Sequence, residues 1–544
     1  MNLQLPHLAR LIQAKAKSTD GSALITFVSL LPGGDYATET RSYRSLWRNG
    51  QRLARAIAEQ GLVAGDRFAL LMQNHAEFVD AMVASAILGT VLVPIDPRTR
   101  GSKLRYMLDA VGCNGVVAGA YAVAALDEVR RDVPGLQWCW VIGRGQGVAA
   151  DAALPEGFGW LDAKLGADAQ DGAGQPDLPI ASEDVNATMQ LVFTSGTTGD
   201  PKAIVGSYAK YAAIGLLAPG MGITPKDRMY TGLSLTHSNA QAITLSGTLY
   251  NGIPTVISQT FSKSRLWSVL RDFRCTTLNL LGGMFNAIYS EPPTAGDADN
   301  PVRLVVGSGI AQTLWEPFEQ RFGLQILEIY GTAEGGCIIK PPGVGPVGSL
   351  GRPVGGLIAH IFDDEDRECG PGEPGEIVFE SPDGSAMSVT YYGNEKASAE
   401  KTRGGMLRTG DIGYRDAEGW YFFLHRKGSE LRRNGEFIAP GFVEKEIAEH
   451  PDVSDVFVYG VPSASGTPGE RDLVAAVVLR AGKDWDAAGL FKWCAARLER
   501  NSVPSYLQQV GEIPKTASEK PIERLLAAAF HPDAPNVARQ AAYA

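Results

Sequence analysis

Two glycines, four hydroxyl side chains and one lysine lie within nine consecutive residues, Thr194–Lys202 (TSGTTGDPK). The preceding Leu191, Val192 and Phe193 favour a strand, whereas glycine and short polar residues disfavour regular structure. A strand that ends in such a loop exposes backbone N–H groups on one concave side, where the hydroxyls and the ammonium also gather. This combination suits a polyphosphate. The residue order differs from the common P-loop, which requires Gly-Lys followed by Ser or Thr.

A second chemical segment is Leu327–Glu334 (LEIYGTAE), which reads as a strand that breaks at Gly331. Tyr330, at the strand end, offers a ring face to a purine. The hydroxyl of Thr332 can contact a phosphate, and the Glu334 carboxylate can hold Mg²⁺ on that phosphate. The segment therefore predicts a nucleotide contact with a metal ligand beside it.

Two further segments fit the same ligand. Asp411 follows Thr409 and Gly410, and a carboxylate that accepts from two adjacent hydroxyls suits a ribose. Gly307-Ser308-Gly309 follows an apolar strand, and glycine there lets the backbone approach the edge of an adenine. Each of these two segments, taken alone, would be read as an ordinary turn. The prediction of a nucleotide site therefore depends on all the segments described above meeting at one place.

Together these segments resemble, in order and over most of the chain, the motifs of the adenylate-forming superfamily. That superfamily includes acyl- and aryl-CoA synthetases, peptide-synthetase adenylation domains and firefly luciferase. The resemblance implies that the loop holds the β- and γ-phosphates of ATP with Thr194, Ser195, Gly196, Thr197, Thr198 and Lys202. It implies contacts with the adenosine and the α-phosphate by Gly307, Ser308, Gly309, Tyr330, Gly331 and Thr332. It also places Asp411 and Arg426 at the ribose, and Glu334 and Thr194 at the Mg²⁺.

The resemblance implies three further roles. Lys520, in the segment IPKTASEK, resembles the C-terminal lysine that bridges the substrate carboxylate and the α-phosphate. A lysine suits this role because it is a point charge on a flexible stem. His237 matches a histidine that gates the acyl pocket, and Gly435 matches a loop that lines the tunnel for the pantetheine of coenzyme A.

The chain departs from the family pattern at four positions. Ala203 and Glu519 replace glycines, and Ala333 stands where the family usually has threonine, as in some members that activate aryl acids. Gly428 stands where the family has Asp or Lys, and it can serve as a pivot because glycine permits wide changes of φ and ψ.

The fold class is predicted to be α/β, with parallel-rich sheets in a large N-terminal domain. Arg67–Met72 and Val91–Ile95 read as buried strands, and Ala76–Leu88 between them has helical apolar spacing, which makes a βαβ unit. Ligands in such sheets lie at the carboxyl ends of the strands. The glycine-rich residues from Gly145 to Gln175 read as a surface linker.

The pattern changes after Lys427, and we expect a large adenylation domain at residues 1–427 and a mobile α+β domain at 428–544. Val453–Val461 and Leu473–Leu479 read as strands of this small domain. Gly441–His450 and Trp485–Leu498 read as its amphipathic helices.

Composition narrows the function classes. The 544 residues include 50 Lys+Arg and 60 Asp+Glu, a net charge of −10, and no basic stripe is visible, so nucleic acid is not expected as a partner. Six scattered cysteines without a CxxC pair suggest reduced thiols in the cytoplasm. No apolar run approaches the roughly 20 residues of a membrane span, and no signal peptide is expected. A homodimer is left open.

The sequence predicts an ATP-dependent acid–thiol ligase that forms an acyl-AMP and then an acyl-CoA. The cofactors would be ATP, Mg²⁺ and coenzyme A, and the partner a carboxylic acid in a roomy, mainly apolar pocket. The pocket would be lined from His237, Asn279–Asn286, Gly307–Ile310 and Gly331–Ile338. By resemblance, the small domain rotates between the two steps, withdrawing Lys520 and presenting Gly435. Two alternatives remain: an adenylating enzyme that loads a carrier protein, and a nucleotide-binding regulator without catalysis.

Overall fold

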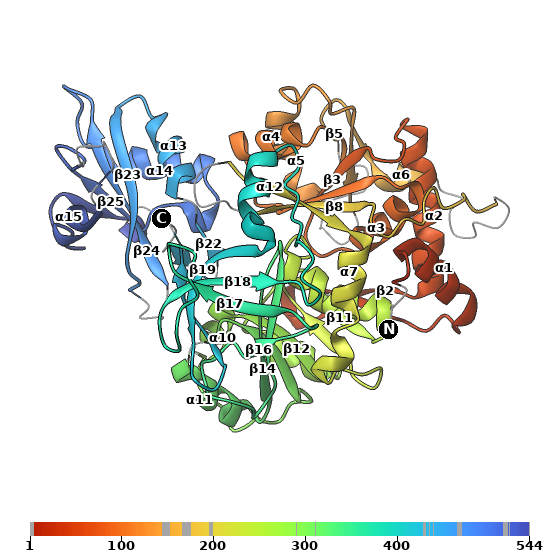
Figure 1. The fold of residues 1–544 in the computed structure, drawn as a ribbon. Helices are drawn as coiled ribbons and strands as arrows, with labels where there is room; N and C mark the ends of the chain where they lie inside the picture. Colours follow the sequence, from red (N-terminus) through yellow and green to blue (C-terminus); the bar gives the residue numbers. More distant parts are fainter. Residues whose placement is uncertain are drawn as a thin grey trace.

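The computed structural model describes the following residues: 5–143, 153–165, 176–194, 200–289, 291–310, 312–427, 431–434, 436–438, 440–464, 470–514, 521 and 523–542. Figure 1 shows a large body made by about the first four fifths of the chain and a small domain, drawn in blue, made by the last fifth. We call the described residues up to 427 the large domain and those from 431 the small domain.

One sheet of the large domain has seven described strands, all parallel except for the last pair. In spatial order they are β7 (Phe158–Trp160), β6 (Trp138–Ile142), β5 (Cys113–Gly119), β3 (Arg67–Leu71), β4 (Val91–Ile95), β8 (Thr188–Thr194) and β9 (Lys202–Ser207). The predicted βαβ unit is confirmed, with α3 at Ala76–Leu88. Its strands are buried almost throughout, as expected of a parallel sheet that is covered on both faces.

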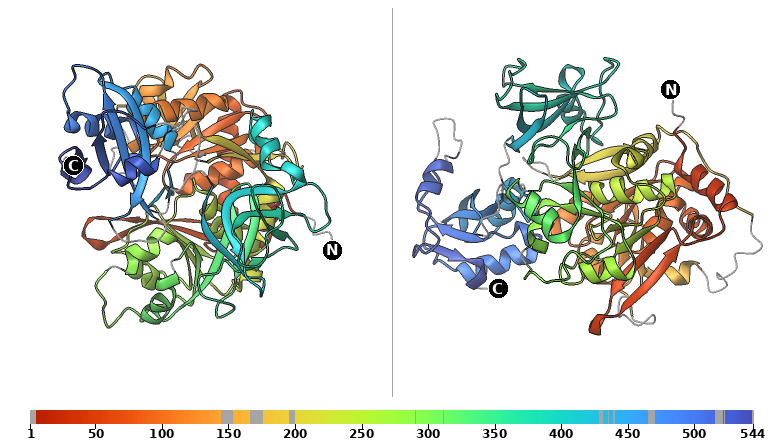
Figure 2. Two further views of the ribbon diagram at one scale, coloured as in Figure 1. Left: turned by 60° about the vertical axis from the view of Figure 1, so that its left-hand side comes forward. Right: turned by 90° about the horizontal axis from the view of Figure 1, so that it is seen from below.

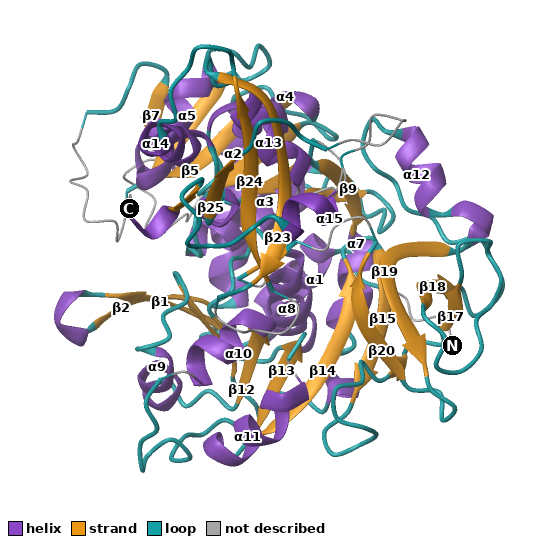
Figure 3. Ribbon diagram, turned by 90° about the vertical axis from the view of Figure 1, so that its left-hand side faces the viewer, coloured by secondary structure: helices purple, strands orange, loops and turns teal. Residues whose placement is uncertain are grey.

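The second sheet has nine described strands, and its six central strands are parallel. In spatial order they are β16 (Arg352–Pro353), β15 (Gly335–Lys340), β14 (Gln325–Thr332), β13 (Leu304–Ser308), β12 (Thr277–Leu281), β10 (Met229–Thr231), β11 (Thr255–Ser258), β1 (Ile25–Leu30) and β2 (Tyr36–Arg41). Strands β1 and β2 extend beyond the body as a hairpin (Figure 3).

The largest hydrophobic core lies between these two sheets, since it contains Phe68 of β3 as well as Ile25 and Ile257 of β1 and β11. Helices fill the space between the sheets or cover them: α1 (Leu8–Ser18), α2 (Tyr43–Glu59), α3, α4 (Gly101–Ala110), α5 (Val123–Arg130), α6 (Leu161–Leu165), α7 (Tyr208–Gly215), α8 (Ser246–Asn251), α9 (Leu266–Asp272), α10 (Gly282–Tyr289) and α11 (Gln312–Phe322). Among the described residues, no helix combines the length and apolar character needed to cross a bilayer.

A third, antiparallel sheet stands apart from the body in the right-hand view of Figure 2. Its strands are β17 (Ile358–Phe362), β18 (Gly375–Glu380), β19 (Leu407–Arg415) and β20 (Tyr421–Arg426), with α12 (Glu395–Lys401) before β19.

The small domain contains a two-stranded and a four-stranded sheet. Its elements are β21 (Arg432–Arg433), β22 (Glu436–Phe437), α13 (Pro440–Ala448), β23 (Val453–Pro462), β24 (Arg471–Leu479), α14 (Ala487–Arg497), β25 (Tyr506–Gln509), α15 (Glu523–Ala528) and β26 (Val537–Arg539). The two strands and two helices predicted here are confirmed to within a few residues at each end.

The predicted linker at residues 145–175 is wrong in its described part. Phe158–Trp160 forms β7 at the edge of the seven-stranded sheet, and α6 follows directly. The aromatic residues explain the difference, because Phe158 and Trp160 supply strand-forming side chains at the edge of the sheet. The remaining parts of that range, and the hinge predicted at Gly428, lie outside the described residues, so the hinge stays a prediction.

Candidate active site

The carboxyl ends of β12, β13 and β14 are neighbours in the nine-stranded sheet, and they bring the predicted adenine loop together with the predicted phosphate segment. Gly309 has φ of +82°, a left-handed conformation that favours glycine. A Cβ on Gly282, which follows β12, would lie 2.3 Å from the Gly309 carbonyl oxygen, so these two backbones touch. We call this place the glycine edge.

Tyr330 and Asp411 meet directly, although 81 positions separate them in the chain. The Tyr330 hydroxyl donates to Asp411 Oδ2 across 2.7 Å, and both side chains are buried. Asp411 lies on β19 opposite Arg426 of β20, whose side chain is outside the described atoms. The predicted purine contact and the predicted ribose contact thus belong to one cluster.

Glu334 is buried, and its side chain contacts Tyr391 and Lys401. The Tyr391 hydroxyl donates to its Oε1 across 2.6 Å, and Lys401 Nζ lies 3.7 Å from the same oxygen. The Nζ of Lys202 lies 5.6 Å from the centroid of the Tyr391 ring. Tyr391 therefore connects the end of the glycine-rich loop to the predicted metal ligand.

Thr194 and Lys202 are paired residues of β8 and β9, so the loop between them leaves and returns at neighbouring points. The loop residues Ser195, Gly196, Thr197 and Thr198 lie outside the described residues, as do Gly435 and Lys520. The roles predicted for them stay predictions.

Thr332 and Glu334 belong to the turn that joins β14 to β15. The Thr332 hydroxyl donates to the Gly335 carbonyl oxygen across 2.9 Å. Lys210 of α7 donates from Nζ to the carbonyl oxygens of Ala333 and Glu334, each across 2.7 Å. Burial lowers the pKa of Lys210 to about 8, and the nearby Glu334 carboxylate opposes that shift.

Glu328 lies beneath the glycine edge, where the Gly309 N–H donates to its Oε1 across 2.5 Å. Burial raises its pKa to about 8, although the N–H groups of Gly309 and Ile310 lower it. Its Oε2 is buried without a hydrogen-bond partner among the described groups. A protonated carboxyl group suits this position. Through this hydrogen bond the Glu328 side chain supports the loop at Gly309.

Arg432 reaches the glycine edge from the small domain. Its Nη2 would lie 3.2 Å from a Cβ on Gly309 and 3.4 Å from one on Gly282. Burial lowers the pKa of this guanidinium, while the carboxylates of Glu470 and Asp411 act in the opposite direction. The small domain therefore delivers a cation to the strand ends where the nucleotide is expected.

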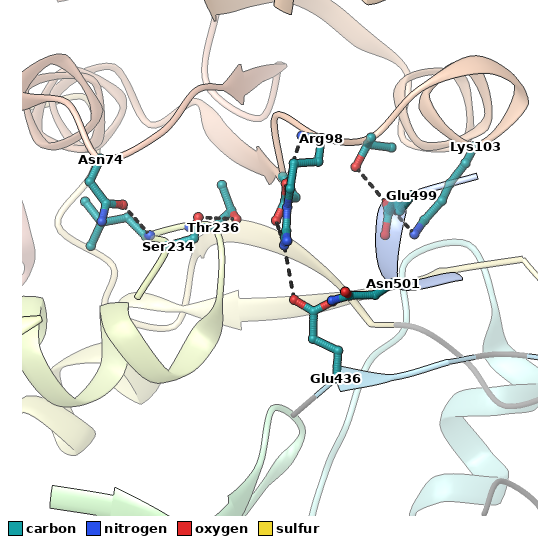
Figure 4. A network of polar contacts seen from close by, with 11 residues as sticks. Asn74, Arg98, Lys103, Ser234, Thr236, Glu436, Glu499 and Asn501 are labelled. Carbon is teal, nitrogen blue, oxygen red and sulfur yellow. Dashed lines mark hydrogen bonds and ion pairs between the residues drawn. The ribbon is translucent and has the colours of Figure 1, made fainter. Parts of the chain in front are cut away.

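A row of polar contacts joins the two domains next to this site (Figure 4). Arg98 Nη2 donates to Asp96 Oδ2 across 2.7 Å and to Glu436 Oε1 of the small domain across 3.1 Å. Further along the chain, Lys103 Nζ of α4 lies 2.7 Å from Glu499 Oε1 of the small domain.

His237 is exposed, in a turn whose backbone is held by a buried asparagine: Asn74 Oδ1 accepts from the Leu235 N–H across 2.7 Å. Burial raises the pKa of Asp96, but the hydrogen bonds and charge of Arg98 outweigh it and hold that pKa below its ordinary value. His237 contributes in the same direction, so the predicted gate lies near the Asp96–Arg98 pair.

Several side chains at the site carried no predicted role: Lys210, Glu328, Tyr391, Lys401 and Arg432. The tyrosine pair Tyr391-Tyr392 and the arginine pair Arg432-Arg433 are visible in the sequence as unusual clusters. Lysines and glutamates on helices or strands give no such signal, because most of them are solvated surface residues.

Comparison with known proteins places the chain in a family. The family model described as AMP-binding enzyme matches residues 13–392, and the model described as AMP-binding enzyme C-terminal domain matches residues 443–520. Together they cover most of the chain and both domains.

Two curated relatives are similar over most of their length. The medium/long-chain-fatty-acid–CoA ligase FadD17 of Mycobacterium tuberculosis is 29% identical, covering 90% of this chain and 91% of that protein. The crotonobetaine/carnitine–CoA ligase of Salmonella heidelberg is 27% identical, covering 89% and 92%.

Among solved structures, the fold is similar to that of the o-succinylbenzoate-CoA synthetase MenE of Bacillus subtilis. The TM-score is 0.77 at 22% identity, and the match covers 96% of this chain and 98% of that one. The predicted α/β architecture with a small C-terminal domain is thereby confirmed. The chain belongs to the family of AMP-binding enzymes.

Proposed function

We propose that this protein activates a carboxylic acid with ATP and transfers the acyl group to the thiol of coenzyme A. The observation that carries the proposal is the pair of buried contacts Tyr330–Asp411 and Tyr391–Glu334. They gather the residues expected at the adenosine and at the metal, and Lys202 lies beside the second pair. The two relatives named above, both acid–CoA ligases, support the same reaction.

The reaction has two steps. A carboxylate oxygen attacks the α-phosphorus of ATP, pyrophosphate leaves, and an acyl-AMP forms. The thiol of coenzyme A then attacks the acyl carbon, AMP leaves with the bonding electron pair, and the thiol proton passes to solvent or a base. The first step needs no protein nucleophile, so orientation and neutralisation of charge carry the catalysis.

The residues present fit a bound Mg²⁺. Glu334 offers a buried carboxylate and Thr194 a hydroxyl, and Mg²⁺ is commonly held by one or two protein oxygens together with phosphate and water. When bound, the ion would neutralise phosphate charge. Glu334 and Thr194 are its proposed ligands, and Asp411 is the proposed ligand of the ribose hydroxyls.

Lys520 is proposed to neutralise the carboxylate and the α-phosphate during the first step. In the second step, the loop at Gly435 is proposed to receive the pantetheine. The position of its neighbour supports this, since Glu436 faces Arg98 of the large domain near His237. We propose that this arrangement of the domains serves the thiol step.

The acid is proposed to be aliphatic, because both named relatives carry names of aliphatic acid ligases. The six cysteines are all free thiols, which supports the cytoplasm as the proposed location.

A panel assay tests the proposal. The protein is mixed with Mg²⁺, ATP and one acid, such as octanoate, crotonobetaine or benzoate, with and without coenzyme A. Release of pyrophosphate together with an acyl-CoA product supports the ligase. Pyrophosphate release without a CoA ester would favour a carrier-protein acceptor, and no release with any acid would favour a regulator.

A further inference from the structure

The turn between β14 and β15 is an unusual hairpin. Thr332 pairs with Gly335, which leaves Ala333 and Glu334 as a two-residue connection. Two-residue hairpins prefer turns with positive φ at one or both central residues, because these match the twist of the strands. Neither Ala333 nor Glu334 has positive φ. The positive φ falls instead on Gly335 and Gly336 after the turn, and the register shifts between Tyr330 and Thr332, so the hairpin is irregular and its two central residues do not fix the turn by themselves.

Lys210 supplies contacts that hold this conformation. An ammonium group can only donate hydrogen bonds. The Nζ of Lys210 donates to two successive carbonyl oxygens, those of Ala333 and Glu334, each across 2.7 Å. Successive carbonyls of an extended strand point in opposite directions, so one ammonium reaches both only when the backbone turns. Because these bonds are charge-assisted, they are stronger than ordinary ones.

The backbone that carries Lys210 is itself anchored. Ser207 caps the start of α7 by accepting from the Lys210 N–H across 3.2 Å. Helix α7 follows β9, which begins at Lys202. The ammonium thus lies on the large domain, next in the chain to the strand that leaves the phosphate loop, and no rotation of the small domain moves it.

The Glu334 carboxylate, the proposed metal ligand, lies on the side of the turn opposite Lys210. The Glu334 carboxylate points to Tyr391 and Lys401, while the Glu334 carbonyl oxygen points to Lys210. Gly335 and Gly336 follow directly with φ of +149° and +74°, so the chain beyond the turn has little intrinsic rigidity. A support on the carbonyl side is what keeps the carboxylate in one direction.

We propose that Lys210 is a positioning residue for acyl-AMP formation: its ammonium selects the turn at Ala333–Glu334 and so aims the Glu334 carboxylate. The inference rests on the proposed function, because it concerns the first step of that reaction. Lys210 does not touch the substrate, and acts through Glu334. Substitution should therefore impair the step that uses Mg·ATP and spare the step that does not.

The test compares two variants. Lys210→Met keeps the length of the side chain but removes its charge and its N–H donors, whereas Lys210→Arg keeps the charge and the donors. Adenylation is followed by pyrophosphate exchange, and the second step by adding coenzyme A to preformed acyl-AMP. Binding of ATP in the presence of Mn²⁺ is measured by calorimetry, and Mn²⁺ occupancy by electron paramagnetic resonance. Lys226→Met, at an exposed lysine after the same helix, is the matched control.

We expect Lys210→Met to lower kcat for adenylation by about 100-fold or more, as the loss of two charge-assisted hydrogen bonds implies. It should also weaken Mn²⁺ binding in the ATP complex, while KM for the acid and the second step change less than about threefold. Lys210→Arg should recover most of the loss, and Lys226→Met should match the parent. If Lys210→Met does not fold, Lys210→Gln takes its place. Its neutral amide keeps two N–H donors on a shorter side chain, so the same losses are expected at a smaller size.

Equal slowing of both steps, or an unchanged Mn²⁺ affinity, would overturn the positioning role. The proposed function fails in a different way, namely when the unsubstituted protein shows no exchange with any acid. The two failures are therefore distinguishable in one set of measurements.

Discussion

Arg98 of the large domain and Glu436 of the small domain share a hydrogen bond of 3.1 Å across the domain boundary. The other carboxylate oxygen of Glu436 accepts from Asn501 Nδ2 across 2.6 Å. Glu436 is thus held on both sides, once within its own domain and once across the boundary. Since it follows Gly435, this contact places the predicted pantetheine loop against the large domain.

Removing this contact should slow the thiol step selectively. The pair is partly exposed, with 54% of the Arg98 side chain and 30% of the Glu436 side chain accessible, so its net stabilisation is at most about 1 kcal/mol. Arg98→Ala and Glu436→Gln should each lower the rate of acyl-CoA formation from preformed acyl-AMP by up to about fivefold. Single-turnover kinetics measure this rate.

The double variant provides the control for that pair. If the two residues act through one contact, the combined effect is smaller than the product of the single effects. Arg105→Ala, on the helix α4 that follows Arg98 and 4.0 Å from Asp132 within the large domain, should leave both steps unchanged. Purely multiplicative effects would show that Arg98 and Glu436 act separately.

Tyr330→Phe should weaken ATP binding. The substitution leaves the ring in place but removes the hydroxyl that donates to the buried Asp411, the proposed ribose ligand. Hydrogen bonds to charged groups contribute about 1.5–3 kcal/mol, so we expect KM for ATP to rise about tenfold or more. Tyr392→Phe, at an exposed tyrosine, is the control. An unchanged KM for ATP would separate this hydroxyl from nucleotide binding.

Glu328→Gln should reduce the dependence of stability on pH. Burial raises the pKa of Glu328 to about 8 in the folded protein, from an ordinary value of 4.5. Between these values the folded state keeps a proton that the unfolded state releases, so stability falls as pH rises through this window, by at most about 1.4 kcal/mol per pH unit.

Glutamine cannot titrate, so the variant should lose less in Tm between pH 6 and pH 9 than the parent does. Thermal unfolding at a series of pH values checks this, with the exposed Glu59→Gln as the reference. Parallel curves for parent and variant would mean that Glu328 is already ionised in the folded protein.

Lys520→Ala should separate the two half-reactions. The loss of a cation at the developing negative charge should lower the rate of acyl-AMP formation by about 100- to 1000-fold. Preformed acyl-AMP should still react with coenzyme A at close to the parent rate. Pyrophosphate exchange and thioester formation are measured in parallel, and an equal loss in both would argue against the role of Lys520.

The fold was largely predictable because its elements carry strong local patterns. The buried strands at Arg67–Leu71 and Val91–Ile95 have continuous apolar runs, and the helix between them has regular spacing. The β7 strand was missed because it is short and lies within a glycine-rich range. A three-residue edge strand depends on its neighbour β6 more than on its own residues.

The candidate site was predictable in part. Tyr330 and Asp411 lie within strands β14 and β19, and Glu334 lies in the turn after β14, each beside an unusual combination of residues. Tyr330 and Asp411 indeed share a hydrogen bond. Tyr391 and Lys210 were not predictable, since each reaches the site from an element with an ordinary sequence. Their roles depend on a partner 57 or more positions away.

By itself, the sequence determined the local features of this protein: a polar loop after β8, glycines where the backbone needs positive φ, and apolar strands that must be buried. These follow from propensities of neighbouring residues, which act over a few positions. Only the tertiary structure decided that Lys210 supports the turn at Glu334, that Arg432 reaches the glycine edge, and that Arg98 meets Glu436. Such contacts arise when two sheets and a small domain pack together, and no local pattern specifies which distant side chains then come within hydrogen-bond distance.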